Sequence, residues 1–301
     1  MNIVQYTNGN YKVFLDLDSG TKIRKNDLDN LTPEYPESMD IKITNRCKQG
    51  CEFCHENSVP DGEDGDIMNA KFIDTLHPYT ELAIGGGDPL EHPDLLKFLE
   101  KCQKLKLVPS MTIHQFAFER HFLFVKELIN KKLIYGLGVS LVLPSKEFIE
   151  KISQFPNAVI HVINGVHSVD ILKKLYDKGL KLLILGYKTF RRGETYSQHH
   201  AIKKDQDKLF KELPKLVKHF NVVSFDNLAL EQLDPRRLLS KEEWDSFFMG
   251  DDGGYTMYVD MVKQQFAKNS TTPVEKRHQM LDNIKDMFDV VVQESKKEGT
   301  K

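Results

Sequence analysis

Three cysteines in one short stretch give the strongest chemical signal in this sequence. Cys47, Cys51 and Cys54 follow one another at spacings of four and three residues, and an aromatic residue, Phe53, precedes the last of them. Three thiolates can bind three irons of a cubane iron–sulfur cluster and leave the fourth iron without a protein ligand. A small molecule can bind at that open iron. The spacing therefore predicts a 4Fe-4S cluster that holds a further ligand.

Zinc is the main alternative for the same residues. His55 follows Cys54 directly and would complete a set of three cysteines and one histidine. Structural zinc sites usually pair two groups of ligands that are distant in sequence, and two adjacent ligands would be strained in facing one ion. An electron-transfer protein would need four ligands to its cluster. The remaining cysteine, Cys102, lies in a predicted helix whose apolar residues recur at helical spacing, and it is expected to be a buried structural thiol. The cluster is favoured, and a zinc-binding module is the non-enzyme alternative.

A glycine-rich stretch at 84–90 is the second chemical signal. Gly86, Gly87 and Asp88 end a predicted strand and lead through Pro89 towards a helix. Glycines at the carboxyl end of a strand let the backbone approach a ligand closely, and a carboxylate there can bind an ammonium group. Taken alone, the stretch is equally compatible with a tight turn between a strand and a helix.

Together the two stretches resemble the motifs of the radical S-adenosylmethionine (SAM) superfamily. Its cluster motif is Cys-x3-Cys-x-aromatic-Cys, and its Gly-Gly-Glu-Pro motif contacts the amino group of SAM. Gly86, Gly87 and Asp88 match the second motif, except that aspartate stands in place of glutamate. The resemblance implies that the three cysteines bind the cluster and that Phe53 lies near the adenine. It also makes Ser140, at the end of the fourth predicted strand, a candidate contact to SAM.

The activity implied by the resemblance is reductive cleavage of SAM to methionine and a 5′-deoxyadenosyl radical, which abstracts hydrogen from a substrate. No catalytic acid or base is assigned, because the cofactors supply the difficult chemistry. An external one-electron reductant such as flavodoxin or ferredoxin is the expected partner. The substrate is expected to be a small molecule or a peptide. Modification of a nucleotide or nucleic acid is the alternative, and the net charge of −2 gives it no support.

Two polar groups downstream are candidate substrate contacts. Arg191 and Arg192 follow the sixth predicted strand, where they are either a solvated basic loop or a site for a carboxylate or phosphate. Asp251, Asp252 and Tyr255 lie around a glycine-rich turn that leads into a predicted strand, which explains them equally well without chemistry.

Strands and helices alternate through the middle of the chain. This order predicts right-handed βαβ units and a parallel sheet. Strands are expected near 39–45, 80–85, 108–114, 135–142, 158–163 and 181–187, and helices near 67–76, 93–106, 119–132, 146–154 and 168–178. Six such units are too few for a closed eight-stranded barrel. The resemblance implies an α/β fold with a partial (β/α)6 radical SAM barrel.

The remaining segments are expected to flank this core. Residues 1–37 should form an N-terminal β-hairpin, with strands at 11–17 and 21–24, and a linker, ahead of the core at 38–190. A mixed C-terminal extension at 191–292 should cover the active site. Its expected helices are at 205–219, 241–247 and 274–292, and its strands at 222–225 and 255–259. Residues 293–301 are expected to be a disordered tail.

The composition of the sequence indicates in which cellular compartment the protein is expected. The 301 residues include 40% hydrophobic residues and four cysteines. No apolar run approaches the roughly 20 residues that a membrane-spanning helix needs. The cysteines are too few and too crowded for a disulfide framework, which favours a reducing compartment. We therefore expect a cytoplasmic protein with no membrane partner.

Overall fold

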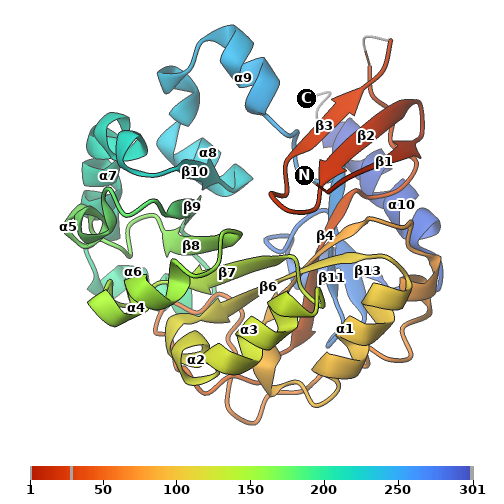
Figure 1. Ribbon diagram of the computed structural model, residues 1–301, viewed down its shortest axis with the longest axis horizontal. Helices are drawn as coiled ribbons and strands as arrows, with labels where there is room; N and C mark the ends of the chain where they lie inside the picture. Colours follow the sequence, from red (N-terminus) through yellow and green to blue (C-terminus); the bar gives the residue numbers. More distant parts are fainter. Residues whose placement is uncertain (1, 28–29, 299–301) are drawn as a thin grey trace.

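The computed structural model describes residues 2–27 and 30–298, and its largest element is one curved, mostly parallel sheet (Figure 1). Within these residues the sheet has ten strands in the order β10-β9-β8-β7-β6-β5-β4-β11-β12-β13. They are β4 (Ser38–Thr44), β5 (Glu81–Gly86), β6 (Val108–His114), β7 (Gly136–Ser140), β8 (Ala158–Ile163), β9 (Lys181–Leu185), β10 (Val222–Phe225), β11 (Thr256–Asp260), β12 (Gln265–Ala267) and β13 (His278–Gln279). The sheet crosses the expected boundary at residue 190, because β10 to β13 extend it at both ends.

Alternation along each strand gives the sheet two different faces. On β4, Met39, Ile41 and Ile43 are buried in the main hydrophobic core, whereas Asp40 and Lys42 point to the opposite, inner face. Figure 1 shows helices packed on the outer, apolar face, whereas α9 stands apart from the sheet. The helices of the described residues are α1 (Leu95–Lys104), α2 (Gln115–Arg120), α3 (Phe122–Asn130), α4 (Lys146–Ile152), α5 (Val169–Leu172), α6 (Arg192–His199), α7 (Ile202–Leu216), α8 (Asn227–Leu233), α9 (Lys241–Phe247) and α10 (Ile284–Glu298). Polar and charged side chains are thereby left to line the inside of the curve.

Side chains, and not strand pairing, join the two ends of this partial barrel. Among the described strands, β10 pairs only with β9, so the sheet does not close. Across the opening, Lys188 Nζ donates to Ser270 Oγ at 3.0 Å, and Asn227 Nδ2 donates to Asp252 Oδ1 at 2.7 Å. The C-terminal segment therefore contacts the loops that follow β9 and β10.

The N-terminal segment forms a separate antiparallel sheet of β1 (Ile3–Asn8), β2 (Tyr11–Asp16) and β3 (Lys22–Lys25). The predicted hairpin corresponds to β2 and β3, whereas β1 was not anticipated. Polar residues alternate through β1, and only Tyr6 and Asn8 are buried, so its apolar signal is weak. Buried Glu37 fixes the sheet to the barrel: it accepts hydrogen bonds from Tyr11 Oη at 2.5 Å and Arg24 Nε at 2.9 Å.

Several predicted helices are wrong in length or position. The segment at 67–76 contains only the 3₁₀ turn Lys71–Thr75, and the helix expected at 119–132 is divided between α2 and α3. In 274–292, a 3₁₀ turn and strand β13 precede α10, because His278 pairs with Phe266 of β12. The tail expected to be disordered is helical at 293–298, and 299–301 lie outside the described residues. Among the described helices, none has the length and apolar character needed to cross a bilayer.

Candidate functional site

The three clustered cysteines lie in a wide loop that leaves the carboxyl end of β4. Backbone hydrogen bonds tie the two arms of this loop together: Cys47 N donates to Val59 O at 2.8 Å, and Asn45 N donates to Glu63 O at 2.8 Å. Thr44 Oγ1 also donates to Asp64 Oδ1 at 2.6 Å. The ends of the cysteine loop, residues 45–63, are therefore fixed to the sheet before any ligand binds.

The three thiols are close enough to one another to interact electrostatically in every pairing, and all three are half-buried. Burial, reinforced by the neighbouring thiols, raises the pKa of Cys51 to about 11. Burial likewise raises the pKa of Cys47 above its usual value. These thiols bind protons tightly when no metal is present. Because thiolates are the ligands of iron, binding of a cluster here would have to displace those protons.

A cubane cluster suits this donor set, because each thiolate binds a different iron and the thiols need not converge on one point. In residues 2–27 and 30–298, no group of three or more histidine, cysteine, aspartate or glutamate side chains has a geometry that would hold a metal ion. The proposed fourth zinc ligand, His55, has its Nε2 atom 3.3 Å from Glu56 Oε1. Its ring is therefore engaged by a carboxylate in the same loop.

The glycine-rich stretch is bonded directly to the residues that lead into the cysteine loop. Gly87 N donates to Thr44 O, and Asp88 N donates to Arg46 O, both at 2.8 Å. A Cβ atom at Gly87 would lie 2.2 Å from Arg46 O, so only glycine permits this approach. A Cβ atom at Gly85 would meet nothing within 4 Å, so this position borders open space on the inner face. The two sequence motifs thus form one backbone unit beside that space.

The Asp88 carboxyl group accepts hydrogen bonds from two neighbouring segments of the protein. Asp88 is 4% exposed, and its Oδ1 accepts a hydrogen bond from Leu90 N at 3.2 Å, which caps a 3₁₀ turn. Gln49 Nε2 of the cysteine loop donates to Oδ2 at 3.4 Å. Burial raises the pKa of Asp88 above its usual value. The shorter side chain therefore links the two motifs to each other, and its contact with SAM stays a prediction.

Ser140 lies on the inner face with two histidines that were not predicted as site residues. The parallel pairing sets His114 of β6 beside Ser140 of β7, and Ser140 beside His161 of β8. The His161 ring covers Gly138, where an added Cβ would lie 2.5 Å from Cε1. Burial lowers the pKa of His161 to about 4, which keeps its imidazole neutral. The sequence did contain a signal for these histidines. Each alternates along its strand with apolar residues that face the helices, which places the histidine on the inner face.

Arg191 and Arg192 contact the cysteine loop. Arg191 Nη1 donates to His55 O at 2.8 Å, and Arg192 Nη1 donates to Cys51 O at 3.2 Å. Substrate recognition by these two residues remains an untested prediction, but their guanidinium groups already have partners within the protein.

The other predicted substrate residues do not come together. Tyr255 packs against the N-terminal sheet, with the Arg24 guanidinium 3.8 Å from its ring centre. Asp251 is exposed. Asp252 lies at the opening of the barrel, where Asn227 Nδ2 and Asn269 Nδ2 each donate to its carboxylate at 2.7 Å. Asp252 is therefore the member of this group that lies nearest the inside of the barrel.

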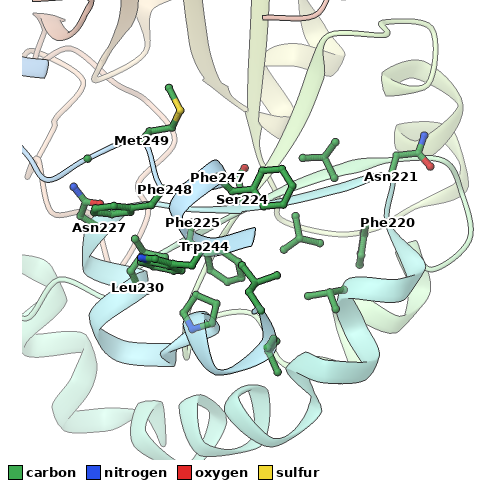
Figure 2. A pocket seen from close by; sticks show the side chains of 17 residues that line it. Phe220, Asn221, Ser224, Phe225, Asn227, Leu230, Trp244, Phe247, Phe248 and Met249 are labelled. Carbon is green, nitrogen blue, oxygen red and sulfur yellow. The ribbon is translucent and has the colours of Figure 1, made fainter. Parts of the chain in front are cut away.

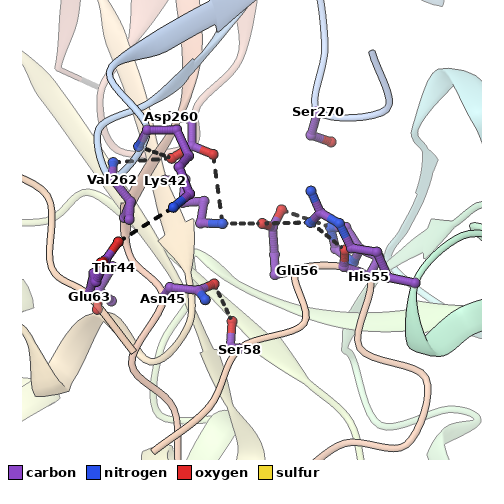
Figure 3. A network of polar contacts seen from close by, with 12 residues as sticks. Lys42, Thr44, Asn45, His55, Glu56, Ser58, Glu63, Asp260, Val262 and Ser270 are labelled. Carbon is purple, nitrogen blue, oxygen red and sulfur yellow. Dashed lines mark hydrogen bonds and ion pairs between the residues drawn. The ribbon is translucent and has the colours of Figure 1, made fainter. Parts of the chain in front are cut away.

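A buried network of charges underlies the cysteine loop (Figure 3). Lys42 Nζ lies 2.7 Å from Glu56 Oε2 and 3.7 Å from Asp260 Oδ2, and Arg277 Nη1 lies 3.3 Å from the same Asp260 oxygen. Burial alone would raise the pKa of Glu56, but His55 and Lys42 hold it well below its usual range through hydrogen bonds and charge. The network connects β4 and β11 to the cysteine loop through ionised groups.

The chain resembles known proteins in its structure and not in its sequence. No protein-family model and no curated protein matches the sequence. Streptococcus suis SuiB bound to S-adenosylmethionine superimposes with a TM-score of 0.62 at 13% identity, over 96% of this chain and 86% of that one. SuiB bound to precursor peptide SuiA gives 0.59 at 11% identity, over 97% and 87%. The chain has the fold of SuiB.

The SuiB fold confirms the predicted fold class, an α/β partial barrel with added N- and C-terminal elements. The likeness extends through the antiparallel β1–β3 sheet and the C-terminal segment, since it covers nearly the whole chain. At these identities the likeness concerns the fold. The chemistry must be argued from the side chains described above.

An apolar cavity of about 690 Å³ lies at the open end of this SuiB-fold sheet (Figure 2). Strand β10 forms one wall, and Trp244, Phe247 and Phe248 from α9 and the residues after it form another. Asn227 also lines the cavity and donates to Asp252 at the barrel opening. The cavity therefore lies next to the barrel opening and contains none of the predicted cofactor residues.

Asp40, on the inner face of the barrel, is expected to make the free energy of unfolding depend on pH. Its side chain is reached by solvent, yet the surrounding barrel desolvates it and raises its pKa to about 6. Because the pKa of Asp40 is higher in the folded protein than in the unfolded chain, ionisation of this carboxyl group destabilises the fold. The folding stability is fully present below the unfolded-state pKa of about 4, and the loss is complete once the pH has risen through about 6. We expect Asp40→Asn to raise the free energy of unfolding by about 1 kcal/mol at pH 8 and by about half that at pH 5, allowing for solvent screening.

Urea denaturation of the two proteins at both pH values measures this effect. The exposed Asp251→Asn is the matched control and should show no such difference between pH 5 and pH 8. A loss of stability in Asp40→Asn at pH 8 would show that the carboxylate is stabilised, and not desolvated, inside the barrel.

Proposed function

We propose that this protein is a radical SAM enzyme. Cys47, Cys51 and Cys54 would hold a 4Fe-4S cluster, and the backbone at Gly86 and Gly87 would face SAM. When bound, this cofactor pair supplies a 5′-deoxyadenosyl radical that abstracts hydrogen from a substrate. The observation that carries the proposal is the backbone unit in which Gly87 N and Asp88 N bond to Thr44 O and Arg46 O. It places the two motifs together at one edge of a SuiB-fold barrel.

The residues of this chain would prepare the site in three ways. The paired arms of the cysteine loop hold the thiols beside the barrel edge. The open space at Gly85 leaves room for a ligand on the inner face. Polar side chains there, including Ser140 and neutral His161, are available to orient the ligand or substrate by hydrogen bonds. We expect no protein acid or base to drive the hydrogen abstraction itself.

For the substrate we propose a peptide. SuiB, which shares this fold, has been captured with the precursor peptide SuiA. Among the described strands, β10 pairs with β9 alone and its other edge borders the apolar cavity at the barrel opening, which would give an extended peptide a place to bind. The electron would come from a small one-electron donor, flavodoxin or ferredoxin, and a reducing cytoplasm suits such a cluster.

Anaerobic reconstitution with iron and sulfide tests the proposed activity. After reduction with dithionite in the presence of SAM, we expect 5′-deoxyadenosine and methionine to form in equal amounts. A protein that binds a full complement of iron and sulfide yet forms neither product would contradict the proposal. A colourless protein with stoichiometric zinc would instead favour a zinc-binding module.

A further inference from the structure

A segment distant in sequence, residues 188–196, contacts the cysteine loop through hydrogen bonds from two arginines. Arg192, at the start of α6, spans both arms of that loop with one guanidinium group. Its Nη1 donates to Cys51 O at 3.2 Å, its Nε donates to Asn57 Oδ1 at 3.0 Å, and its Nη2 donates to Ser58 O. The arms are therefore joined across the loop, as well as at its base.

The neighbouring Arg191 fixes the same loop between those arms. Its Nη1 donates to His55 O at 2.8 Å and lies 3.6 Å from Glu56 Oε2, the carboxylate that also pairs with Lys42. Arg191 has a φ of +55° and a ψ of −132°, a conformation that residues other than glycine rarely adopt and that costs about 1–3 kcal/mol. Such strain persists where surrounding contacts impose it, and it concentrates at functional sites.

Packing between the two segments supports these polar contacts. The Phe53 and Tyr196 rings meet edge to face with centroids 5.6 Å apart, and the His55 and Phe190 rings do so at 6.3 Å. A Cβ at Gly193 would lie 2.2 Å from Lys188 O, so the turn that presents the arginines is tight. The segment 188–196 thus has a defined position against the cysteine loop.

We propose that Arg191 and Arg192 are positioning residues that hold the cysteine loop ready to receive its cluster. The inference rests on the proposed function and adds to it a role for the loop after β9. A planar guanidinium can donate to several carbonyl groups at once, which a lysine ammonium cannot match in geometry. Ordering the loop in advance removes an entropic cost from cluster binding. Their positive charges would also favour the reduced, more negative cluster.

Iron-free protein gives the first test, because it needs no cofactor. We expect Arg192→Gln to raise the rate at which iodoacetamide alkylates Cys51 and Cys54 by about tenfold, since several charge-assisted hydrogen bonds are lost. Arg192→Lys keeps the charge and should give an intermediate rate. Arg237→Gln is the matched control: it removes the same kind of bond, from Arg237 Nη2 to Phe210 O at 2.6 Å, away from the loop. It should leave the alkylation rate unchanged.

Reconstituted protein gives the second test. We expect Arg192→Gln to hold less iron per chain than Arg237→Gln and to have a more negative cluster reduction potential. Equal alkylation rates in the glutamine variants at 192 and 237 would overturn the proposal. If the wild-type protein takes up no cluster, the proposed function fails, while the alkylation rates still decide whether the arginines hold the loop.

Discussion

Replacing Cys47, Cys51 or Cys54 by alanine is expected to abolish both the iron–sulfur cluster and the cleavage of SAM. In the proposed cluster each thiolate would bind a separate iron, so losing one would leave a second iron without a protein ligand. The brown colour of anaerobically reconstituted protein should disappear, and the 5′-deoxyadenosine formed should fall to background. Iron and sulfide analysis, visible absorbance and chromatography of the products measure these changes.

Cys102→Ala is the control for these variants. Cys102 is fully buried on α1 and belongs to the main hydrophobic core, away from the cysteine loop. Truncation there should cost about 1 kcal/mol of folding stability and leave the cluster intact. Normal SAM cleavage in any one of the three loop variants would refute the assignment of the ligands.

Gly87→Ala is the second change with a large expected effect. The added Cβ would lie 2.2 Å from Arg46 O and 2.8 Å from Arg46 C, both rigid backbone atoms, so the strand end must move. We expect the free energy of unfolding to fall by about 2 kcal/mol. Because the displaced backbone joins the glycine-rich stretch to the cysteine loop, SAM affinity should also fall by about tenfold or more. Denaturant unfolding and equilibrium dialysis with labelled SAM measure the two effects.

Gly85→Ala separates the two causes. The same methyl group at Gly85 meets nothing within 4 Å, so the fold should keep its stability within about 0.5 kcal/mol. The methyl group would still extend into the space that SAM is proposed to occupy, so SAM affinity should fall without a loss of cluster. If Gly87→Ala were as stable as the wild type, the close approach described here would be incorrect.

Local patterns were enough to predict the elements that carry the motifs. The strands β4 to β9 were recognisable from their alternation, and 222–225 and 241–247 correspond to β10 and α9. Spacing alone selected the cysteine loop, because ligands to one cluster must be close in space and the proposed ligands are also close in sequence. Ser140 was placed correctly at the end of β7 by counting strands.

Contacts between segments that are distant in the sequence could not be predicted from local sequence patterns. Arg192 reaches Cys51 across 141 positions, and a local pattern contains no information about such a pair. Strand β13 formed where apolar spacing suggested a helix, because pairing with β12 outweighs the helical preference of a short segment. His114 and His161 were not predicted as site residues, although each alternates along its strand with apolar residues that face the helices.

The proposed function requires an open iron that binds SAM, and electron paramagnetic resonance of the reduced, reconstituted protein tests this directly. Spectra should be recorded with and without SAM, alongside iron and sulfide analysis of the same sample. We predict about four irons per chain and a signal of the reduced 4Fe-4S cluster whose g-values shift when SAM is added. A fully loaded cluster whose signal is identical with and without SAM would contradict the account.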